Sequence, residues 1–181
     1  MEVIVESYSH FVHTHILLSA FVQFFILGMA GECLGLYIAG KNPFRVMTGL
    51  QFLLKMAAWG VLGLIIKYAF TGFVGFASAL GEEGMIGTFF RSGPGKAFFV
   101  SVSMNVLFGP QMMAFHRVTD NLIMKTKGFA GLEKSFMTLL WFWIPAHTVT
   151  FLLPEDYRIG LAALWSVALG VIMGFFKRRG V

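Results

Sequence analysis

Ionisable and amide side chains interrupt otherwise apolar stretches of this chain, and their types and positions are the first clue to its chemistry. They are Glu32, Lys55, Lys67, Asn105, His116, Arg117, Asp120 and His147. An ionisable side chain at the centre of a bilayer costs ~2.5–3.5 kcal/mol on insertion scales, so it is expected to face protein, another polar group or water. Such groups could bind a polar solute or line a hydrated path.

Patterns for catalysis and metal binding do not accompany these residues. The sequence has no glycine-rich phosphate loop, no nucleophile elbow and no His-Glu-x-x-His segment. Cys33 would need a nearby base to act as a nucleophile, but the adjacent Glu32 points elsewhere on a helix. The histidines show no zinc or haem ligand spacing. We therefore expect no enzyme activity, no cofactor and no metal.

The elements that must position these residues are membrane-spanning helices. Of the 181 residues, 57% are hydrophobic and 13% charged, about half the charged fraction of a soluble domain. A spanning helix needs ~20 mostly apolar residues. Runs of about this length cover 16–39, 56–80, 97–115, 136–153 and 159–176. We predict an all-α integral membrane protein, a bundle of about five transmembrane helices that forms a single membrane domain over residues 1–181.

The basic residues between these spans predict the orientation of the bundle. Those on one side are Lys41, Arg45, Arg117, Lys125, Lys127, Lys134, Lys177, Arg178 and Arg179. The other side carries Arg91, Lys96 and Arg158. Cytoplasmic loops are enriched in Lys and Arg, which predicts an outside N-terminus and a cytoplasmic C-terminus in a bacterial inner (plasma) membrane or an equivalent one. The net charge of +5 therefore needs no nucleic-acid partner.

Counting along the helices at ~1.5 Å per residue gives the polar residues approximate depths. Glu32 and Lys55 fall in the inner half of the membrane, where we expect them to form an ion pair. Lys67 and Asn105 fall near the midplane, as residues of a solute path. His147 falls roughly two-thirds of the way outward along the fourth span.

The third span carries the longest polar stripe. If the helix continues through Pro110, residues that share one face are Ser101, Asn105, Gly109, His116 and Asp120. Pro110 removes a backbone hydrogen bond and either kinks the helix or ends it. Asp120 follows Arg117 at a spacing at which helical side chains meet. We expect this pair to form a cytoplasmic gate or cap.

Small residues recur at helical spacing in the first and last spans. They include Gly28, Gly31, Gly35, Ser166, Gly170 and Gly174. Ladders of small residues let helix backbones approach closely where lipid supplies no hydrophobic drive for association. We expect these residues to pack helices within the bundle, or alternatively to form a contact between copies in a homo-oligomer.

Residues 109–120, GPQMMAFHRVTD, resemble a segment of the Mpv-seventeen and peroxisomal-membrane-protein-twenty-two family of small membrane proteins. The matching residues are Gly109, Pro110, Phe115, His116 and Asp120. Residues 141–158, WFWIPAHTVTFLLPEDYR, are similar to the C-terminal pattern of that family. Its matching residues are Trp143, Pro145, Phe151, Pro154 and Arg158. Met113 and Thr150 depart from the family's histidine and asparagine, and residues 1–80 hold a helix beyond its usual four spans.

This resemblance implies pore or channel behaviour toward small solutes, which agrees with the buried polar residues. We predict an integral membrane protein that forms a pore or transport pathway for small solutes or metabolites, with the bilayer and the solute as its partners. The alternative is a noncatalytic membrane scaffold or accessory subunit, in which the same polar groups only hold the helices together.

Overall fold

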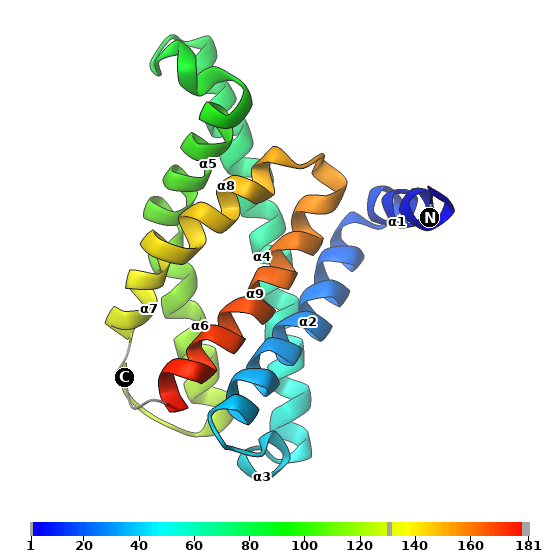
Figure 1. Ribbon diagram of the computed structural model, residues 1–181, viewed down its shortest axis with the longest axis vertical. Coiled ribbons are helices and arrows are strands. Elements are labelled where there is room, and N and C mark those ends of the chain that lie inside the picture. The colour runs from blue at the N-terminus through cyan, green and yellow to red at the C-terminus, as the bar shows by residue number, and fades with distance from the viewer. Residues whose placement is uncertain (1, 130–131, 179–181) are drawn as a thin grey trace.

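A computed structural model describes residues 2–129 and 132–178 of the chain, and its regular elements are all helices (Figure 1). In chain order they are α1 (Glu2–Thr14), α2 (Ile16–Ile38), α3 (Pro43–Val46), α4 (Gly49–Glu82), the 3-10 helix η1 (Thr88–Arg91), α5 (Gly93–Leu107), α6 (Gly109–Met124), α7 (Leu132–Thr138), the π-helical turn η2 (Leu139–Trp143), α8 (Ile144–Leu152) and α9 (Glu155–Arg178).

The lengths and apolar character of these helices are those of a membrane protein. Four segments can each cross a bilayer, and a bent pair of helices makes a fifth when it counts as one span. They are Ile16–Ile38, Gly49–Glu82, Leu132–Leu152, Glu155–Phe176 and the pair Gly93–Leu107 with Gly109–Met124. The predicted all-α class and the number of about five spans are confirmed at this level.

The helices pack around one apolar core. Helix α2 packs most extensively against α9 and α4, while α5 packs against α8. The core residues are Ala20, Phe24, Ile66, Phe70, Ala77, Ala97, Val100, Met104, Phe151, Ile159, Ala162 and Ala163. The α4–α5 hairpin extends beyond the α8–α9 turn at one end of the molecule (Figure 1). Large apolar side chains that face outward, such as Leu50, Leu53 and Tyr68 on α4, are positioned to contact lipid.

The small residues of α2 and α9 form a tight seam within one chain. A Cβ atom added at Gly31 would lie 2.6 Å from the carbonyl oxygen of Ser166, and one added at Gly35 would lie 2.6 Å from that of Gly170. One at Gly174 would lie 2.7 Å from the Gly35 oxygen. Gly28 does not belong to this seam, because it faces the Trp59 ring of α4 and not α9. These residues therefore serve packing within the chain.

The second span begins earlier than the predicted residue 56. Thr48 accepts a hydrogen bond from the backbone N–H of Gln51, and the Gln51 side chain accepts one from the Thr48 N–H. This capping box starts α4 at Gly49, so that the helix runs for 34 residues. At ~1.5 Å per residue the helix is about 51 Å long, well beyond the ~30 Å hydrocarbon thickness.

The third span is broken rather than continuous. Helix α5 ends at Leu107 and α6 begins at Gly109, with a bend of 49° between them. Pro110 stands in the first turn of α6, where its missing N–H costs no intrahelical bond. The single stripe expected from Ser101 to Asp120 is consequently wrong, because the bend turns the α6 residues toward a different neighbour.

The fourth span contains a wide turn that the sequence reading did not predict. Instead of a uniform helix over 136–153, a π-helical turn at Leu139–Trp143 joins α7 to α8. Pro145 lies just after it and cannot donate a backbone hydrogen bond to the preceding turn. Local widening of this kind absorbs the missing bond and the clash of the proline ring.

The N-terminal segment, treated above only as a tail, forms helix α1 and turns away from the axis of α2 (Figure 1). The Tyr8 ring stacks on Tyr157 of α9 at 5.7 Å between centroids. Asp156 accepts a 2.5 Å hydrogen bond from the Ser9 hydroxyl and lies 2.8 Å from His13 Nε2. Helix α1 is therefore docked on the start of α9.

The connections with most of the basic residues meet at one end of the bundle. The α2–α3 turn, the C-terminal end of α6 and the C-terminal end of α9 lie together at the lower end in Figure 1, opposite the α4–α5 hairpin. Arg179, which the charge count includes, lies outside the described residues.

Candidate functional site

Three helices contribute to a charge cluster in which Lys55 is buried and the carboxylates of Glu32 and Asp120 are partly exposed. The Lys55 side chain is 4% exposed and forms ion pairs with both carboxylates, at 2.6 Å to Asp120 Oδ1. The expected contact between Glu32 and Lys55 is present. Asp120 joins it because α6, after the bend, packs against α4. With two acids and one base, the cluster has a formal charge of −1.

Two aromatic rings cover this charge cluster. The Trp59 indole N–H donates to Glu32 Oε2 at 3.2 Å, and the His116 ring lies 4.7 Å from the Trp59 ring. His116 Nδ1 is buried without a hydrogen-bond partner among the described residues. The predicted pairing of Arg117 with Asp120 is wrong in this structure, since no ion pair of Arg117 occurs in the described ranges and Asp120 bonds Lys55.

Lys67 lies apart from the other predicted path residues. Its Nζ atom is 2.8 Å from Glu155 Oε1, at the turn between α8 and α9. This turn lies at the end of the α8–α9 hairpin, and the pairing places Lys67 apart from Asn105, with which we expected it to share a solute path.

Asn105 instead forms a buried hydrogen-bond cluster with α8. Its Nδ2 atom donates to the Ser101 carbonyl at 2.8 Å and lies 3.1 Å from His147 Nδ1. The Ser101 hydroxyl donates to the Ile144 carbonyl at 2.7 Å. Because the amide nitrogen is a donor, His147 Nδ1 is the acceptor and the imidazole is held in its neutral form, with the proton on Nε2.

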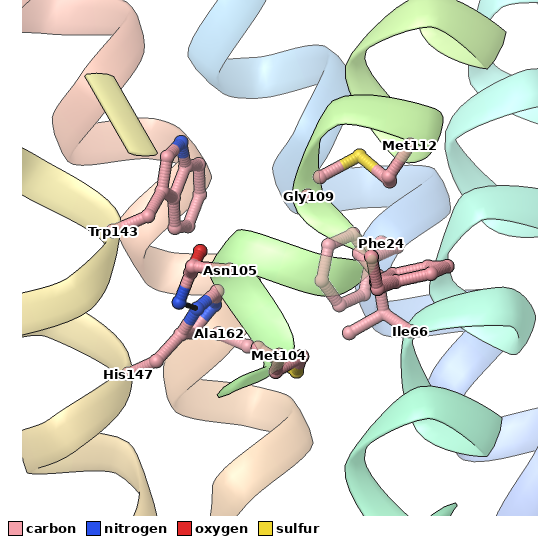
Figure 2. Close-up of a pocket in the computed structure, with 10 residues that line it drawn as sticks. Phe24, Ile66, Met104, Asn105, Gly109, Met112, Trp143, His147 and Ala162 are labelled. Atoms are coloured by element: carbon pink, nitrogen blue, oxygen red, sulfur yellow. Dashed lines mark hydrogen bonds between the residues drawn. The ribbon is translucent and has the colours of Figure 1, made fainter. Parts of the chain in front are cut away.

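A small cavity lies beside this cluster (Figure 2). Residues of α2, α4, α5, α6, η2, α8 and α9 line it. Its volume is about 20 Å³, enough for one water molecule. The lining residues are Phe24, Ile66, Met104, Asn105, Phe108, Gly109, Met112, Trp143, His147 and Ala162. Figure 2 shows Trp143, Asn105 and His147 together on one side of the space, with Phe24 and Ile66 on the other. We call this space the central cavity.

The α5–α6 break and the π-helical turn border the central cavity. Phe108 and Gly109 are the residues of the α5–α6 break, and Trp143 is the last residue of the π-helical turn. Trp143 Nε1 is buried and has no hydrogen-bond partner within the part of the chain that the structure describes. A buried donor left without an acceptor costs ~1–3 kcal/mol. Trp143 is therefore a lining residue with an unsatisfied buried donor.

The predicted site residues do not converge on one wet interior. They form three groups: the charge cluster of α2, α4 and α6, the Lys67–Glu155 pair, and the Asn105–His147 cluster at the central cavity. Sequence reasoning missed Trp143 and Glu155, because nothing local to them shows that they meet Asn105 and Lys67. Pro145, just after Trp143, was the available signal for an irregular helix at this position.

No protein-family model, curated protein or solved structure matches this chain.

Proposed function

We propose that this chain is a noncatalytic membrane transport protein that conducts a small uncharged polar solute through the central cavity. The observation that carries this proposal is the convergence of two helix interruptions, α5–α6 and η2, on one mostly apolar cavity that Asn105 and His147 also line. Interrupted helices within a membrane occur where backbone lines a cavity, and transport proteins use them to build solute sites.

The lining of the central cavity supports an uncharged solute. It contains no Lys, Arg, Asp or Glu, and His147 is neutral. The Trp143 N–H offers a donor, while Asn105 Oδ1 accepts no hydrogen bond within the described residues. A small solute with both donors and acceptors, such as urea or glycerol, would satisfy these groups, whereas an ion would lose its hydration without a counter-charge.

Passage requires the cavity to open, because about 20 Å³ holds no such solute. Helix α6 is the element best suited to move. Of its 16 residues only Gly109 is buried. Its contacts with α4 include the Lys55–Asp120 ion pair and a 3.2 Å hydrogen bond from Gln51 Nε2 to the Ile123 carbonyl. We infer that α6 pivots at the break and that the charge cluster holds it closed, which replaces the predicted Arg117–Asp120 gate.

Charge distribution supports an orientation for this path. The basic connections lie together at one end of the bundle (Figure 1), which agrees with a cytoplasmic C-terminus and an outside N-terminus by the positive-inside rule. A bacterial inner membrane is our proposed location. The resemblance of residues 109–120 and 141–158 to the Mpv-seventeen family agrees with solute conduction.

Flux in reconstituted liposomes tests the proposal. Stopped-flow light scattering would measure urea and glycerol entry with the wild-type chain, with N105L and with the matched control N121L. Asn121 is remote from the cavity and binds the Gly128 carbonyl. We expect N105L to reduce flux at least about tenfold, because it removes polar groups that must replace solute hydration, and N121L to have little effect.

A scaffold or accessory subunit is the second candidate, and a specific observation favours it. Lys55 and Lys67 are neutralised by partners within the chain, as in a bundle that only needs internal cohesion. Wild-type liposomes that conduct neither solute faster than empty ones would favour this candidate. Equal flux through N105L and the wild-type chain would exclude the central cavity as the path.

A further inference from the structure

A second cavity, separate from the central one, lies beside the Lys67–Glu155 pair. Its volume is about 70 Å³, room for several water molecules or one small ion. Its lining residues are Lys67, Phe70, Thr71, Val74, Glu155, Arg158 and Ile159. We call it the rim cavity, since it adjoins the α8–α9 turn.

The charged side chains around the rim cavity carry a net positive charge, which favours the binding of an anion. Lys67 and Arg158 supply two positive charges, and Glu155 supplies one negative charge. Lys67 Nζ contacts only Glu155 among the described residues. Arg158 Nε donates to the Leu153 carbonyl at 2.9 Å, but neither terminal guanidinium nitrogen has a protein acceptor in the described ranges. Donors thus remain available on two sides of the cavity.

The Glu155 carboxylate is exposed enough for an anion to displace it from Lys67. Its side chain is 63% exposed, whereas that of Lys67 is 13% exposed, although the two atoms that pair lie 2.8 Å apart. The Lys67 side chain is therefore mostly buried, whereas the Glu155 carboxylate contacts it from the solvent-exposed side. Rotation of Glu155 away from Lys67 would leave a partly buried ammonium group facing a cavity, together with the Thr71 hydroxyl one helical turn further along α4.

The position of the rim cavity brings it near lipid headgroups. Helix α1 turns away from the spanning helices at the same end and contacts Asp156, the neighbour of Glu155. Val3, Val5 and Phe11 of α1 are exposed, as in helices that lie along a membrane surface. The first backbone N–H groups of α9 add a partial positive charge at this level.

We propose that the rim cavity binds one oxyanion, a phosphate or carboxylate group, between Lys67 and Arg158, and that the Glu155 carboxylate occupies this position when the anion is absent. Binding exchanges one Lys67 ion pair for another, so the cost of burying Lys67 stays compensated throughout. The anion comes either from a lipid headgroup or from solution, since both carry the same chemistry.

The two sources define the two arms of the test. In the first, calorimetric titration with sodium phosphate at constant ionic strength uses the full chain in phosphatidylcholine nanodiscs. In the second, native mass spectrometry measures how much phosphatidylglycerol the purified chain retains relative to phosphatidylcholine. The variants are E155Q, K67M and the control K96M. Lys96 donates to Ser78 in the distant hairpin and lies outside the rim cavity.

We expect E155Q to bind the anion about tenfold more tightly than the wild-type chain, because the competing carboxylate is gone. K67M should bind about tenfold more weakly, and K96M should match the wild-type chain. Binding in the phosphatidylglycerol arm alone would assign the anion to lipid, and binding in the phosphate arm would assign it to solution.

Absence of binding to E155Q in both arms would overturn the proposal, as would equal losses in K67M and K96M. E155Q keeps Lys67 and Arg158 and decides the question even if K67M does not fold. These outcomes are independent of solute flux, so they are distinguishable from failure of the proposed transport function.

Discussion

Removing Lys55 is the sharpest perturbation of the charge cluster. K55M leaves Glu32 and Asp120 without their shared cation, while the Trp59 indole still donates to Glu32. Breaking a buried ion pair by removing one partner costs ~3–5 kcal/mol. The two carboxylates are 21% and 31% exposed, which places the expected loss of unfolding free energy at the lower end, about 3 kcal/mol.

The other members of the cluster should cost less. E32Q and D120N each leave Lys55 with one carboxylate partner, so we expect each to lose about 1–2 kcal/mol. The triple variant E32Q/K55M/D120N has no buried charge left to compensate. Replacing a whole buried ionic cluster by neutral groups is often close to neutral, so the triple variant should lose about 1 kcal/mol, less than K55M alone.

Reversible unfolding in mixed micelles would measure these differences in unfolding free energy, with intrinsic tryptophan fluorescence as the signal. An unchanged denaturant slope would show that the variants unfold to the same extent as the wild-type chain. Independent sites add within ~0.3–0.5 kcal/mol, whereas contacting residues do not. A triple-variant loss equal to the sum of the three single losses would refute the reasoning, since it would mean that the three side chains do not interact.

Two further perturbations address the seam and helix α1. G170L should prevent folding or lower the unfolding free energy by at least about 3 kcal/mol, because its side chain would clash with the backbone of Gly31. The control G72L has open space around Gly72, so it should keep the wild-type unfolding free energy in the same micelle assay. Burial raises the pKa of the Tyr8 hydroxyl, which donates to Gln23. The docking of α1 should therefore be strongest below the ordinary tyrosine pKa and should weaken as the pH rises through the raised pKa. Amide hydrogen exchange of α1 measures this, and unchanged protection of α1 at alkaline pH would contradict the prediction.

The fold class and the Glu32–Lys55 contact could be predicted from the sequence because both follow from simple physical constraints. Apolar runs of bilayer length must be helical, since a helix satisfies its own backbone hydrogen bonds. Two opposite charges at similar depths on consecutive spans have few other partners in hydrocarbon. Neither conclusion depends on how distant parts of the chain are packed.

Asp120 and Lys67 show where such reasoning fails. Spacing along one helix makes Arg117 available to Asp120, but it does not reveal that a lysine from another helix competes for the same carboxylate. Likewise, the count along α4 does not reveal that Lys67 pairs with Glu155 at the start of α9. Both partners are far from these residues in the sequence, so they depend on tertiary packing.

The central cavity was beyond prediction for a related reason. Pro110 and Pro145 each announce a disturbed helix, but only the packing of α5 against α8 brings Asn105 to His147. The unpaired Trp143 nitrogen is likewise a property of the assembled bundle. Pro110 therefore predicted the disturbed third span, whereas the wide turn before Pro145 and the place where the two irregularities meet were found only in the structure.

The seam between α2 and α9 has a consequence for biosynthesis. Ribosomes extend chains at about 5–20 residues per second, so α2 enters the membrane several seconds before the Gly170 and Gly174 positions of α9 exist. During that interval the Gly31 and Gly35 face of α2 has no partner from its own chain. Close packing of this face must therefore wait until α9 has been synthesised and inserted.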